Sequence, residues 1–456
     1  MRVLTRDIGQ HEDETTELCG WVVGRRDHGS IIFIDLMDYS GTTQCVLDES
    51  QGRELRPEWV IKISGQVVKR PKGMVNPDLP TGQWEVKVKA LEILSKAETS
   101  PFALDTDGYE IGEENRLQYR YLDLRRPRLR KNLRQRQRVL NFIRQYLIER
   151  DFVEVETPIL SKSTPEGARD YLVPSRLQKG KFYALPQSPQ QYKQLLMVAG
   201  LERYFQIARC FRDEDTRGDR QPEFTQLDLE MSFAEREEVM DLIEDLYTKI
   251  IEALFPEKRI AEKLFPRLTY AAAMEKYNSD KPDLRKNKED SEELALTWIT
   301  DFPFFEKTGD GWTFTHNPFS APKKEHLPWL LAKEKIGEIL TTQYDLVLNG
   351  EEIGGGSVRS HRPEALQAVL ETIGLQKKTI RENFGPMLDA LKYGAPPHGG
   401  IAMGLDRFLA ILFNEPNIRE VIAFPKTGDG RDLMMNAPAA VDKKQLFDLG
   451  LKQGPV

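Results

Sequence analysis

The sequence predicts an α+β protein in which a small five-stranded β barrel precedes a larger unit of mixed strands and helices. Three observations predict it. Short alternating apolar segments separated by turns fill the first hundred residues, and two long segments with helical apolar spacing follow at 129–150 and 234–256. A pair of strand-like segments lies between those helices, at 204–233. The length of 456 residues corresponds to about three folding units.

The barrel prediction rests on five short segments with strand character. They are 18–23, 31–36, 43–48, 60–67 and 84–93. A polar piece that could be helical, 49–59, separates the third from the fourth. This order is typical of a Greek-key barrel of the oligonucleotide-binding (OB) type, although other small β barrels fit the composition as well. We place the barrel at residues 1–104 and a linker at 105–128.

The second unit is placed at residues 129–456. Its first helix follows Pro127, a residue favoured in a first helical turn. Residues 278–295 are strongly charged and almost devoid of large apolar side chains, so a loop or a short exposed helix is expected there.

Composition narrows the class of protein. The net charge is −7, from 65 basic and 72 acidic residues, and no apolar stretch approaches the roughly 20 residues of a membrane helix. The N-terminus lacks the apolar core of a signal peptide, so a cytoplasmic protein without a membrane association is expected. Residues 116–138 hold ten Arg or Lys against the single acid Asp123. Such a run is either a solvated or acid-paired face or a contact for nucleic-acid phosphates.

Three segments concentrate chemically active side chains. In 224–233 every second residue is polar, and the preceding loop is dense in Arg, Asp and Glu. A glycine-rich turn at 399–404 leads into an apolar helix that carries Arg407 in its first turn, which suits a phosphate. The hairpin signal Asn349-Gly350 precedes three successive glycines. Each segment also has a purely structural interpretation: a solvated sheet face, a structural Asp-Arg pair, or glycines needed for packing.

Taken together, these segments resemble one family over nearly the whole chain. FRDED with RQPEFTQLD is similar to motif 2 of the class II aminoacyl-tRNA synthetases, GIAMGLDR to motif 3, and FVEVETPIL (152–160) to motif 1. More narrowly, STPEGARDY (163–171), QSPQQYKQ (187–194), NGEEIGGGSVR and the barrel resemble the bacterial-type aspartyl-tRNA synthetases. The resemblance implies a mostly antiparallel catalytic sheet flanked by helices, and a homodimer built through motif 1.

The implied reaction joins L-aspartate and ATP into aspartyl-adenylate and then transfers the aspartyl group to the 3′ end of tRNA(Asp). By this resemblance Arg212, Glu214 and Arg407 are catalytic. The implied ATP contacts are Arg212, Asp213, Glu214, Gln221, Phe224, Glu352, Gly404, Leu405, Asp406 and Arg407. The implied aspartate contacts are Glu166, Ser188, Gln190, Lys193, Arg212, Asp228, His316 and Arg359. Asp345 and Glu352 would hold Mg²⁺, which prefers oxygen ligands.

In the barrel, the resemblance implies that Phe33 stacks on an anticodon base and that Arg25 and Gln44 read base edges. Phe33 could instead belong to the barrel core. His28 and Gly82 stand where the form of the enzyme that charges both tRNA(Asp) and tRNA(Asn) has these residues. We therefore expect relaxed tRNA specificity, with a separate amidotransferase acting on the asparagine-tRNA product; a discriminating enzyme is the alternative.

The sequence also departs from the bacterial type. The domain-sized insertion that normally follows a segment like YNSDKPDLR is missing or drastically shortened, leaving 277–300 as its remnant, and Asn317 replaces a second histidine. Two other classes remain as alternatives. A catalytically silent RNA-binding paralogue predicts decay of the arginines and carboxylates named above, all of which are present. A small-molecule ligase would have no use for an anticodon-reading barrel.

Overall fold

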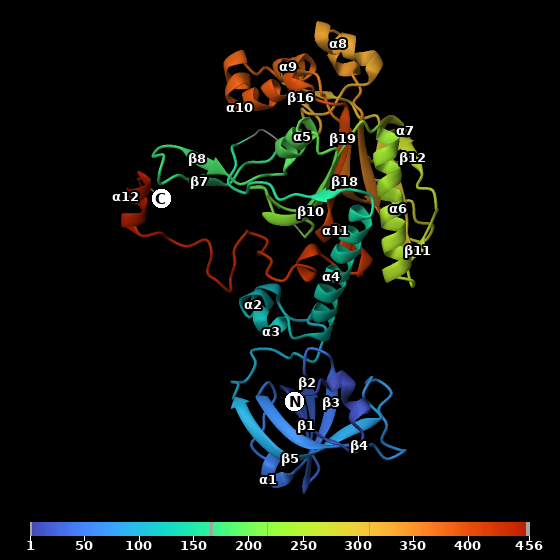
Figure 1. Ribbon diagram of the computed structural model, residues 1–456, viewed down its shortest axis with the longest axis vertical. Helices are drawn as coiled ribbons and strands as arrows, with labels where there is room; N and C mark the ends of the chain where they lie inside the picture. Colours follow the sequence, from blue (N-terminus) through green and yellow to red (C-terminus); the bar gives the residue numbers. More distant parts are fainter. Residues whose placement is uncertain (1, 164–166, 217, 310, 453–456) are drawn as a thin grey trace. The chain divides into compact units, whose positions relative to one another are not determined.

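The structure is a computed structural model that describes residues 2–163, 167–216, 218–309 and 311–452. The chain divides into two compact units, Met1–Gly112 and Glu113–Val456, each of which is described by itself (Figure 1).

The first unit is the predicted five-stranded barrel. The strands are β1 (Thr15–Asp27), β2 (Ile31–Met37), β3 (Thr42–Asp48), β4 (Val60–Lys69) and β5 (Trp84–Ser95). They close in the order β1-β2-β3-β5-β4, with only β3 and β5 parallel. A 3₁₀ helix, η1 (Thr5–His11), precedes β1, and the short helix α1 (Glu49–Gly52) lies in the segment predicted to be helical. The structure confirms the OB-type prediction.

Alternation along the strands separates the barrel interior from its surface. Ile32, Ile34 and Leu36 of β2 are fully buried in the barrel core. Phe33 and Asp35 lie between them and are half-buried on the opposite face of the strand. Phe33 is therefore not a core residue, and it is available to a ligand on the outside of the barrel.

An eight-stranded sheet forms the centre of the second unit, in the order β12-β14-β17-β18-β19-β10-β9-β6. All neighbouring pairs are antiparallel except the two at the edges, β12-β14 and β9-β6, which are parallel. The strands are β6 (Val153–Glu154), β9 (Arg203–Phe211), β10 (Glu223–Ser232), β12 (Arg267–Thr269), β14 (Leu296–Thr300), β17 (Gln343–Leu348), β18 (Glu351–Val358) and β19 (His398–Gly404). The mostly antiparallel sheet is as predicted.

Helices and small strand pairs surround this sheet. The helices are α2 (Glu113–Gln118), α3 (Arg120–Asp123), α4 (Pro127–Ile148), α5 (Gln190–Val198), α6 (Arg236–Leu254), α7 (Tyr270–Tyr277), α8 (Leu327–Ala332), α9 (Pro363–Thr372), α10 (Lys377–Ala390), α11 (Leu405–Leu412) and α12 (Lys443–Leu449), with 3₁₀ turns η2 (Lys324–His326), η3 (Ile336–Glu338), η4 (Leu391–Tyr393) and η5 (Ile418–Glu420). The small pairs are β7 (Leu172–Pro174) with β8 (Phe182–Ala184), β11 (Arg259–Ile260) with β13 (Glu293–Leu294), and β15 (Phe305–Thr308) with β16 (Gly311–Phe314).

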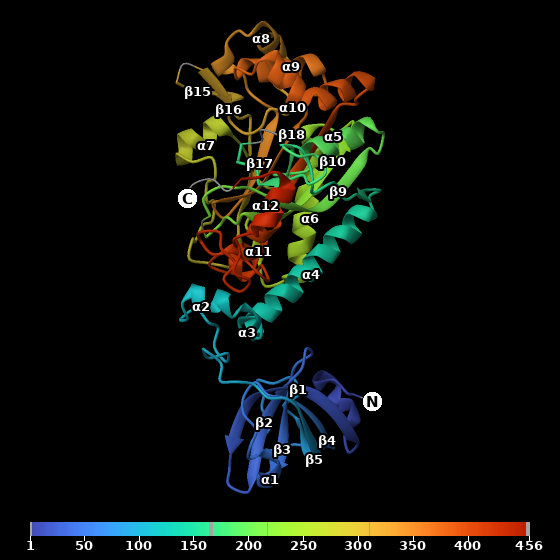
Figure 2. The same ribbon diagram turned by 90° about the vertical axis from the view of Figure 1, so that its left-hand side faces the viewer.

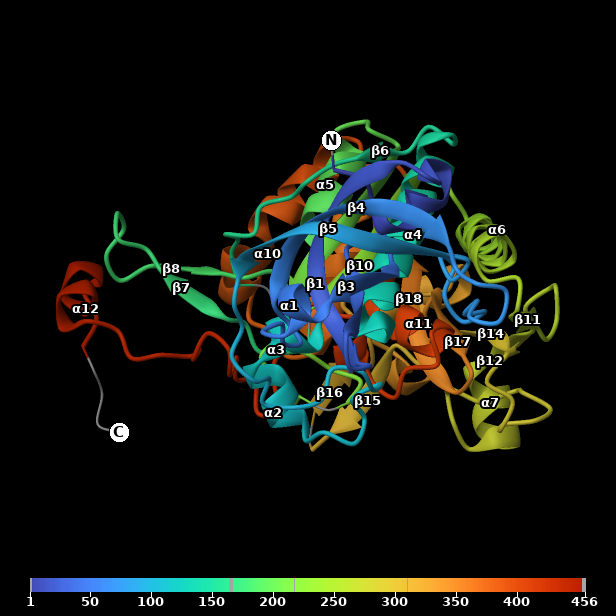
Figure 3. The same cartoon turned by 90° about the horizontal axis from the view of Figure 1, so that it is seen from below.

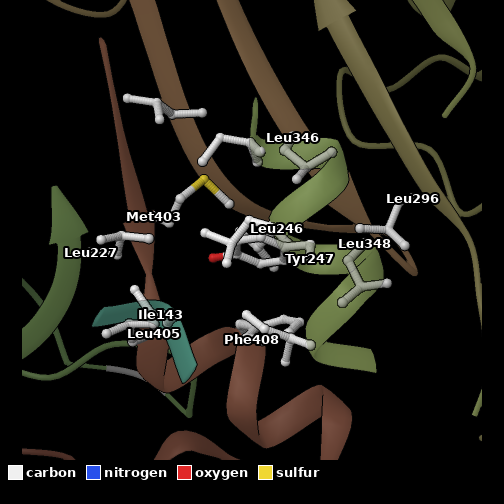
Figure 4. Packing of buried hydrophobic residues seen from close by; sticks show 14 of the residues in the cluster. Ile143, Leu227, Leu246, Tyr247, Leu296, Leu346, Leu348, Met403, Leu405 and Phe408 are labelled. Atoms are coloured by element: carbon white, nitrogen blue, oxygen red, sulfur yellow. The ribbon is translucent and has the colours of Figure 1, made fainter. Parts of the chain in front are cut away.

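The main core forms where α4, α6 and α11 pack against one face of the sheet (Figure 2). Leu227 of β10 and Met403 of β19 point toward Ile143, Tyr247 and Phe408 from the three helices (Figure 4). Because side chains alternate along a strand, the residues between Leu227, Leu229 and Met231 point to the other face. Burial of the apolar face therefore directs Gln226, Asp228 and Glu230 toward the opposite face, which α5 adjoins and where the cavity described below lies.

Much of the basic run at 116–138 pairs with acids elsewhere in the fold. Arg116, Arg120 and Arg126 are buried and all hydrogen-bond Asp123. Arg116 also binds Glu420 of η5 through both terminal nitrogens, at 3.1 and 2.8 Å. These three arginines are thus internal, and residues 113–128, expected in the linker, fold as α2, α3 and the start of α4 within the second unit.

The segment near the C-terminus lies beside the β7–β8 pair (Figures 1 and 3). The ammonium of Lys179, in the turn between β7 and β8, lies 6.0 Å from the ring centre of Phe447 in α12.

The predicted remnant of the insertion, 277–300, consists mainly of turns and irregular segments, which are followed by the strands β13 and β14.

Candidate functional site

A cavity of about 420 Å³ opens on the polar face of the sheet. It lies among α5, the loop between β9 and β10, strand β18 and the turn from β19 into α11. The predicted residues that line it are Ser188, Gln190, Lys193, Arg212, Glu214, Gln221, Phe224, His316, Glu352, Arg359, Gly404, Asp406 and Arg407. Segments separated by more than 200 residues in the sequence thus form one site.

One end of the cavity is built by the loop between β9 and β10. The guanidinium of Arg212 lies 5.0 Å from the ring centre of Phe224, so a cation and an aromatic face adjoin each other there. Arg220 binds Glu214 at 3.2 Å, and Gln221 is held by the backbone of Lys426 through both amide atoms. These contacts fix the loop while leaving the Phe224 ring half-buried at the cavity wall.

Arg407 lies in the first turn of α11, as predicted. It pairs with Asp219 at 3.1 Å and also donates to the backbone carbonyl of Glu352, while its Nε is buried without a partner among the described residues. Its neighbour Asp406 accepts from the backbone N–H of Thr225 at 2.8 Å and binds Arg136 of α4. The first turn of α11 is therefore held in place by contacts with both β10 and α4.

At the other end, two cations and two carboxylates form a buried cluster. Lys193 binds Asp228 at 2.6 Å and Glu230 at 3.3 Å. Arg359 binds both oxygens of Glu230 through Nε and one terminal nitrogen, at 2.8 and 3.1 Å, and it also donates to Ser357 and to the carbonyl of Gly400. All four charged side chains are almost completely buried.

The cluster shifts the pKa values of its two acids in opposite directions. Burial alone would raise the pKa of Glu230, but Arg359 and Lys193 lower it to about 2. Burial dominates at Asp228 and raises its pKa, although Lys193 opposes the change. The Oδ2 atom of Asp228 is buried, and the Tyr204 hydroxyl that adjoins this carboxylate donates to Gln206, which leaves Oδ2 without a close donor among the described residues. A buried acceptor of this kind is satisfied when a ligand donates to it.

The two predicted metal ligands lie together on β17 and β18. Burial and the charge of nearby Glu352 raise the pKa of Asp345 well above its ordinary value. His316 Nδ1 lies 3.8 Å from Asp345, and Gln343 donates to the same carboxylate at 2.6 Å. Two hard, mutually repelling carboxylates suit a Mg²⁺ ion. The described residues include no group of three or more carboxylate, histidine or cysteine side chains placed to hold a metal ion, so phosphate oxygens and water would complete such a site.

Several predicted site residues do not line this cavity. Leu405 lies in the apolar core, so its side chain cannot contact a ligand in the cavity. Asp213 belongs to a separate hollow together with Tyr171 and Asp429. Asp228 and Asp345 do not line the cavity, but each accepts a hydrogen bond from a residue that does, Lys193 and Gln343 respectively. Glu166 lies outside the described residues.

The structure also brings in residues that the sequence reasoning had not assigned. Asp219 and Glu230 were noticed only as members of a charged loop and a polar strand face, yet they are the partners of Arg407 and Arg359. Gln343, Ser357, Gln194 and His398 had no sequence signal of their own. Gln194 contacts His398, and Ser320 contacts both Gln343 and Ser357, so these residues meet across long sequence separations that periodicity cannot reveal.

On the barrel, a second set of polar groups surrounds Phe33. His28 meets its ring edge-on at 5.5 Å. Arg26 binds Asp35 through both terminal nitrogens and donates to Gln44 at 3.1 Å, and Gln44 in turn donates to Glu85 at 2.9 Å. Phe33 and Gln44 therefore lie among polar groups on the outer face, as expected.

Arg25 and Gly82 have different surroundings. Arg25 donates to the backbone of Gly52 and pairs with Asp27, so Arg26 rather than Arg25 shares the face of Phe33 and Gln44. Gly82 closes a tight turn, in which a Cβ atom would lie 1.8 Å from the carbonyl oxygen of Asn76. Only glycine fits that position without movement of the loop.

This fold and site define a class II aminoacyl-tRNA synthetase. The family of class II tRNA synthetases (D, K and N) matches residues 112–428, and the OB-fold nucleic acid binding domain matches residues 16–94. The chain belongs to this D, K and N family, and it is an aminoacyl-tRNA synthetase.

Relatives named aspartate–tRNA(Asp/Asn) ligase match almost the whole chain. The protein from Rubrobacter xylanophilus is 44% identical, with 97% of this chain and 94% of the relative covered. The protein from Corynebacterium jeikeium is 40% identical, with 97% and 96% covered. The first alignment spans 574 positions, so at least 118 of them (574 less 456) are gaps in this chain. That difference fits the shortened insertion inferred from the sequence.

Solved structures share the fold at lower identity. The asparaginyl-tRNA synthetase of Pyrococcus horikoshii, complexed with asparaginyl-adenylate, gives a TM-score of 0.74 at 20% identity, covering 94% of this chain and 98% of that one. The aspartyl-tRNA synthetase of Entamoeba histolytica gives a TM-score of 0.70 at 21% identity, covering 91% of this chain and 89% of that one.

Among the described residues, no helix is both long and apolar enough to span a membrane.

Proposed function

We propose that the protein activates L-aspartate with ATP and transfers the aspartyl group to the 3′ ends of tRNA(Asp) and tRNA(Asn). The observation that carries the choice of amino acid is the buried cluster of Lys193, Arg359, Asp228 and Glu230 beside the cavity. The assignment of tRNA partners draws on the relatives that bear the name aspartate–tRNA(Asp/Asn) ligase.

The two cations each keep one N–H for a ligand. Arg359 uses its Nε–H, both hydrogens of one terminal nitrogen and one of the other on Glu230, Gly400 and Ser357. Lys193 donates to Asp228 and forms a longer ion pair with Glu230 at 3.3 Å, so at least one of its three N–H groups remains for a ligand. The side-chain carboxylate of aspartate would therefore receive one hydrogen bond from each cation. A bidentate contact of Arg359 with the substrate through that edge of the guanidinium is not available, because Glu230 occupies it.

The amino group of the substrate is assigned to the acceptors of the same cluster. Asp228 has a buried, unpartnered carboxylate oxygen, and Gln190 lines the cavity. An ammonium group offers three donors, which suit these acceptors. Asparagine would place an amide N–H₂ against the remaining N–H groups of Lys193 and Arg359, and this mismatch disfavours it.

In the first step, the α-carboxylate of aspartate attacks the α-phosphate of ATP, and pyrophosphate leaves. Negative charge increases on the phosphate in the transition state, so fixed cations lower the barrier. We assign Arg212 to the substrate carboxylate and α-phosphate, Phe224 to stacking on adenine, Glu214 to the adenosine and Arg407 to the γ-phosphate. When bound by Asp345, Glu352 and the nucleotide, Mg²⁺ supplies charge neutralisation and orients the phosphates.

In the second step, a terminal ribose hydroxyl of the tRNA attacks the carbonyl of the adenylate, and AMP leaves. The half-exposed face of Phe33 and the polar groups around it provide stacking and edge contacts for an anticodon base. His28 adjoins that ring, and Gly82 allows a compact loop; both support a reader that accepts two anticodons. The product on tRNA(Asn) would then require an amidotransferase.

The enzyme is further proposed to be a homodimer. Val153, Ile159 and Leu160, in the motif 1 segment, expose large apolar side chains. Several exposed large apolar side chains within one short segment are typical of a protein interface.

The decisive test is aminoacylation with radiolabelled aspartate on two transcripts, one with the aspartate and one with the asparagine anticodon. We expect charging of both. Charging of the first alone would retain the ligase and refute relaxed specificity. A lack of aspartate-dependent ATP–pyrophosphate exchange would refute the proposed function itself.

A further inference from the structure

A buried chain of hydrogen bonds leads from the start of β19 to the amino-acid end of the cavity. Its members are Pro396, His398, Gln194 and Gln190, and the last of these lines the cavity. Gln194 and His398 are fully buried, and Gln190 is 8% exposed. Gln190 and Gln194 lie one turn apart on the same face of α5. Neither Gln194 nor His398 lines the cavity, and their hydrogen bonds lead to Gln190, which does.

The direction of each hydrogen bond in this series can be deduced by starting from Pro396, the member farthest from the cavity. The carbonyl of Pro396 can only accept, and it lies 2.7 Å from His398 Nδ1, so this nitrogen carries the hydrogen. Burial lowers the pKa of His398, so the ring is neutral near pH 7 even though Glu230 faces it; Arg359 and His361 add to the lowering. In the neutral ring the other nitrogen, Nε2, is an acceptor.

Because Nε2 of His398 accepts, the orientations of the Gln194 and Gln190 amide groups are also determined. Gln194 must direct its N–H₂ group toward His398 Nε2, at 3.1 Å. Its carbonyl oxygen therefore faces Gln190, which donates its own N–H₂ group to it at 3.1 Å. The N–H₂ group of Gln190 is thus turned toward Gln194, with one N–H already donated, and the oxygen is the only acceptor that its amide offers to the cavity. An isolated glutamine could present either its oxygen or its N–H₂ group to a ligand. Gln190 cannot invert its amide without breaking its hydrogen bond to Gln194.

We propose that His398 and Gln194 are positioning residues that hold Gln190 as a hydrogen-bond acceptor for the amino group of the amino-acid substrate. This inference rests on the proposed function, because it assumes an amino acid in the cavity. The ammonium group donates only, so an inverted Gln190 amide would oppose it. A protonated His398, or the loss of either relay residue, would remove that control.

The test compares two ligands that differ only in the amino group. ATP–pyrophosphate exchange gives KM and kcat for aspartate, and competitive inhibition by succinate, which is aspartate without its amino group, gives Ki. The variants are Gln194→Leu and His398→Phe, which break the relay. Gln190→Leu shows the full loss of the acceptor. His398→Gln is the matched control, because its amide oxygen can still accept from Gln194.

For Gln194→Leu and His398→Phe we expect KM for aspartate to rise about tenfold, which corresponds to roughly one net hydrogen bond, while kcat falls less than the affinity. Ki for succinate should stay at the wild-type value, and His398→Gln should retain the wild-type KM. Thermal melts identify any variant that fails to fold; in that case Gln194→Leu and His398→Phe each provide the test without the other.

Two results would overturn the inference. Equal losses for aspartate and succinate would show that the relay only supports the general shape of the pocket. A wild-type KM for aspartate in the folded relay variants would show that Gln190 needs no such control. Both results differ from failure of the proposed function, in which the wild-type enzyme itself would show no aspartate-dependent exchange.

Discussion

The carboxylate of Asp406 accepts a hydrogen bond from the backbone N–H of Thr225 at 2.8 Å, and its other oxygen binds Arg136. One side chain thereby connects the start of α11, the strand β10 and the helix α4. Phe224 and Arg407, the two residues assigned to opposite ends of ATP, are the immediate neighbours of Thr225 and Asp406 in the sequence. The geometry of the nucleotide site thus depends on Asp406, whose carboxylate is already paired with Arg136 inside the protein.

Replacement of Asp406 by alanine is expected to affect both stability and ATP binding. Removal of one partner from a largely buried ion pair leaves Arg136 uncompensated and should lower the free energy of unfolding by about 2–4 kcal/mol. KM for ATP should rise more than KM for aspartate, because Phe224 and Arg407 lose their common anchor. Urea denaturation and exchange kinetics measure the two effects. An unchanged KM ratio would contradict this anchoring role.

Arg359 is expected to determine the choice of amino acid. Arg359→Leu leaves Glu230 buried without its main partner and removes a donor to the substrate carboxylate, so kcat/KM for aspartate should fall by about a hundredfold or more. Arg359→Lys should recover little of this, since lysine lacks the forked geometry. The control is Arg381→Leu at an exposed position of α10, because the surface pair of Arg381 with Asp389 should contribute almost nothing. A small, similar effect for both positions would argue against the assignment.

Phe33 is expected to act in tRNA binding alone. Phe33→Leu removes an aromatic face, and a stacked base contributes about 1–3 kcal/mol, so KM for tRNA should rise by roughly tenfold. ATP–pyrophosphate exchange should not change, because this reaction needs no anticodon. Leu94→Ala, at an exposed position of β5, is the control. Reduced exchange in Phe33→Leu would mean that the residue stabilises the fold instead.

The buried Glu230 should make the enzyme sensitive to acid. Its pKa is about 2 in the folded protein, below the ordinary value of 4.5, because Arg359 and Lys193 outweigh the effect of burial. The ionised form therefore contributes stability that is fully present above about pH 4.5 and is lost as the pH falls toward 2. The difference in unfolding free energy between wild type and Glu230→Gln should shrink as the pH falls from 6 to 3. A difference that does not change with pH would show that this carboxylate does not titrate as described.

The proposed dimer can be tested at the motif 1 segment. The wild-type protein should sediment as a dimer at micromolar concentration. Leu160→Asp places a charge on an exposed apolar residue of that segment and should shift the protein toward monomers. Leu264→Asp is the matched control, because Leu264 is the most exposed leucine of the second unit and lies outside the segment. A wild-type monomer would refute the proposal.

The alternation in β10 shows how much the sequence could predict. Leu227, Leu229 and Met231 were expected on one face and Gln226, Asp228 and Glu230 on the other, and the structure confirms both faces. The period of two is a property of the extended backbone, so neighbours in the chain suffice to predict it. The five barrel strands, α4 and α6 were found in the same way, with differences of a few residues at their ends.

The pairings within the sites could not be predicted in this way. Arg116 with Glu420, Arg407 with Asp219 and His398 with Gln194 join residues that only the folded chain brings together. Likewise, Arg25 and Arg26 are adjacent in the sequence, and it was the strand register that placed Arg26 rather than Arg25 beside Gln44.

The sequence by itself determined the two-part architecture, the strand and helix periods and, through its motifs, the family to which the chain belongs. Those features depend on local backbone geometry and on the order of residues along the chain. Only the tertiary structure decided which charges neutralise one another, which hydrogen-bond donors remain for a ligand, and that Gln190 directs its N–H₂ group to Gln194. The reason is that a buried polar group must be satisfied by whatever the fold places within about 3 Å of it.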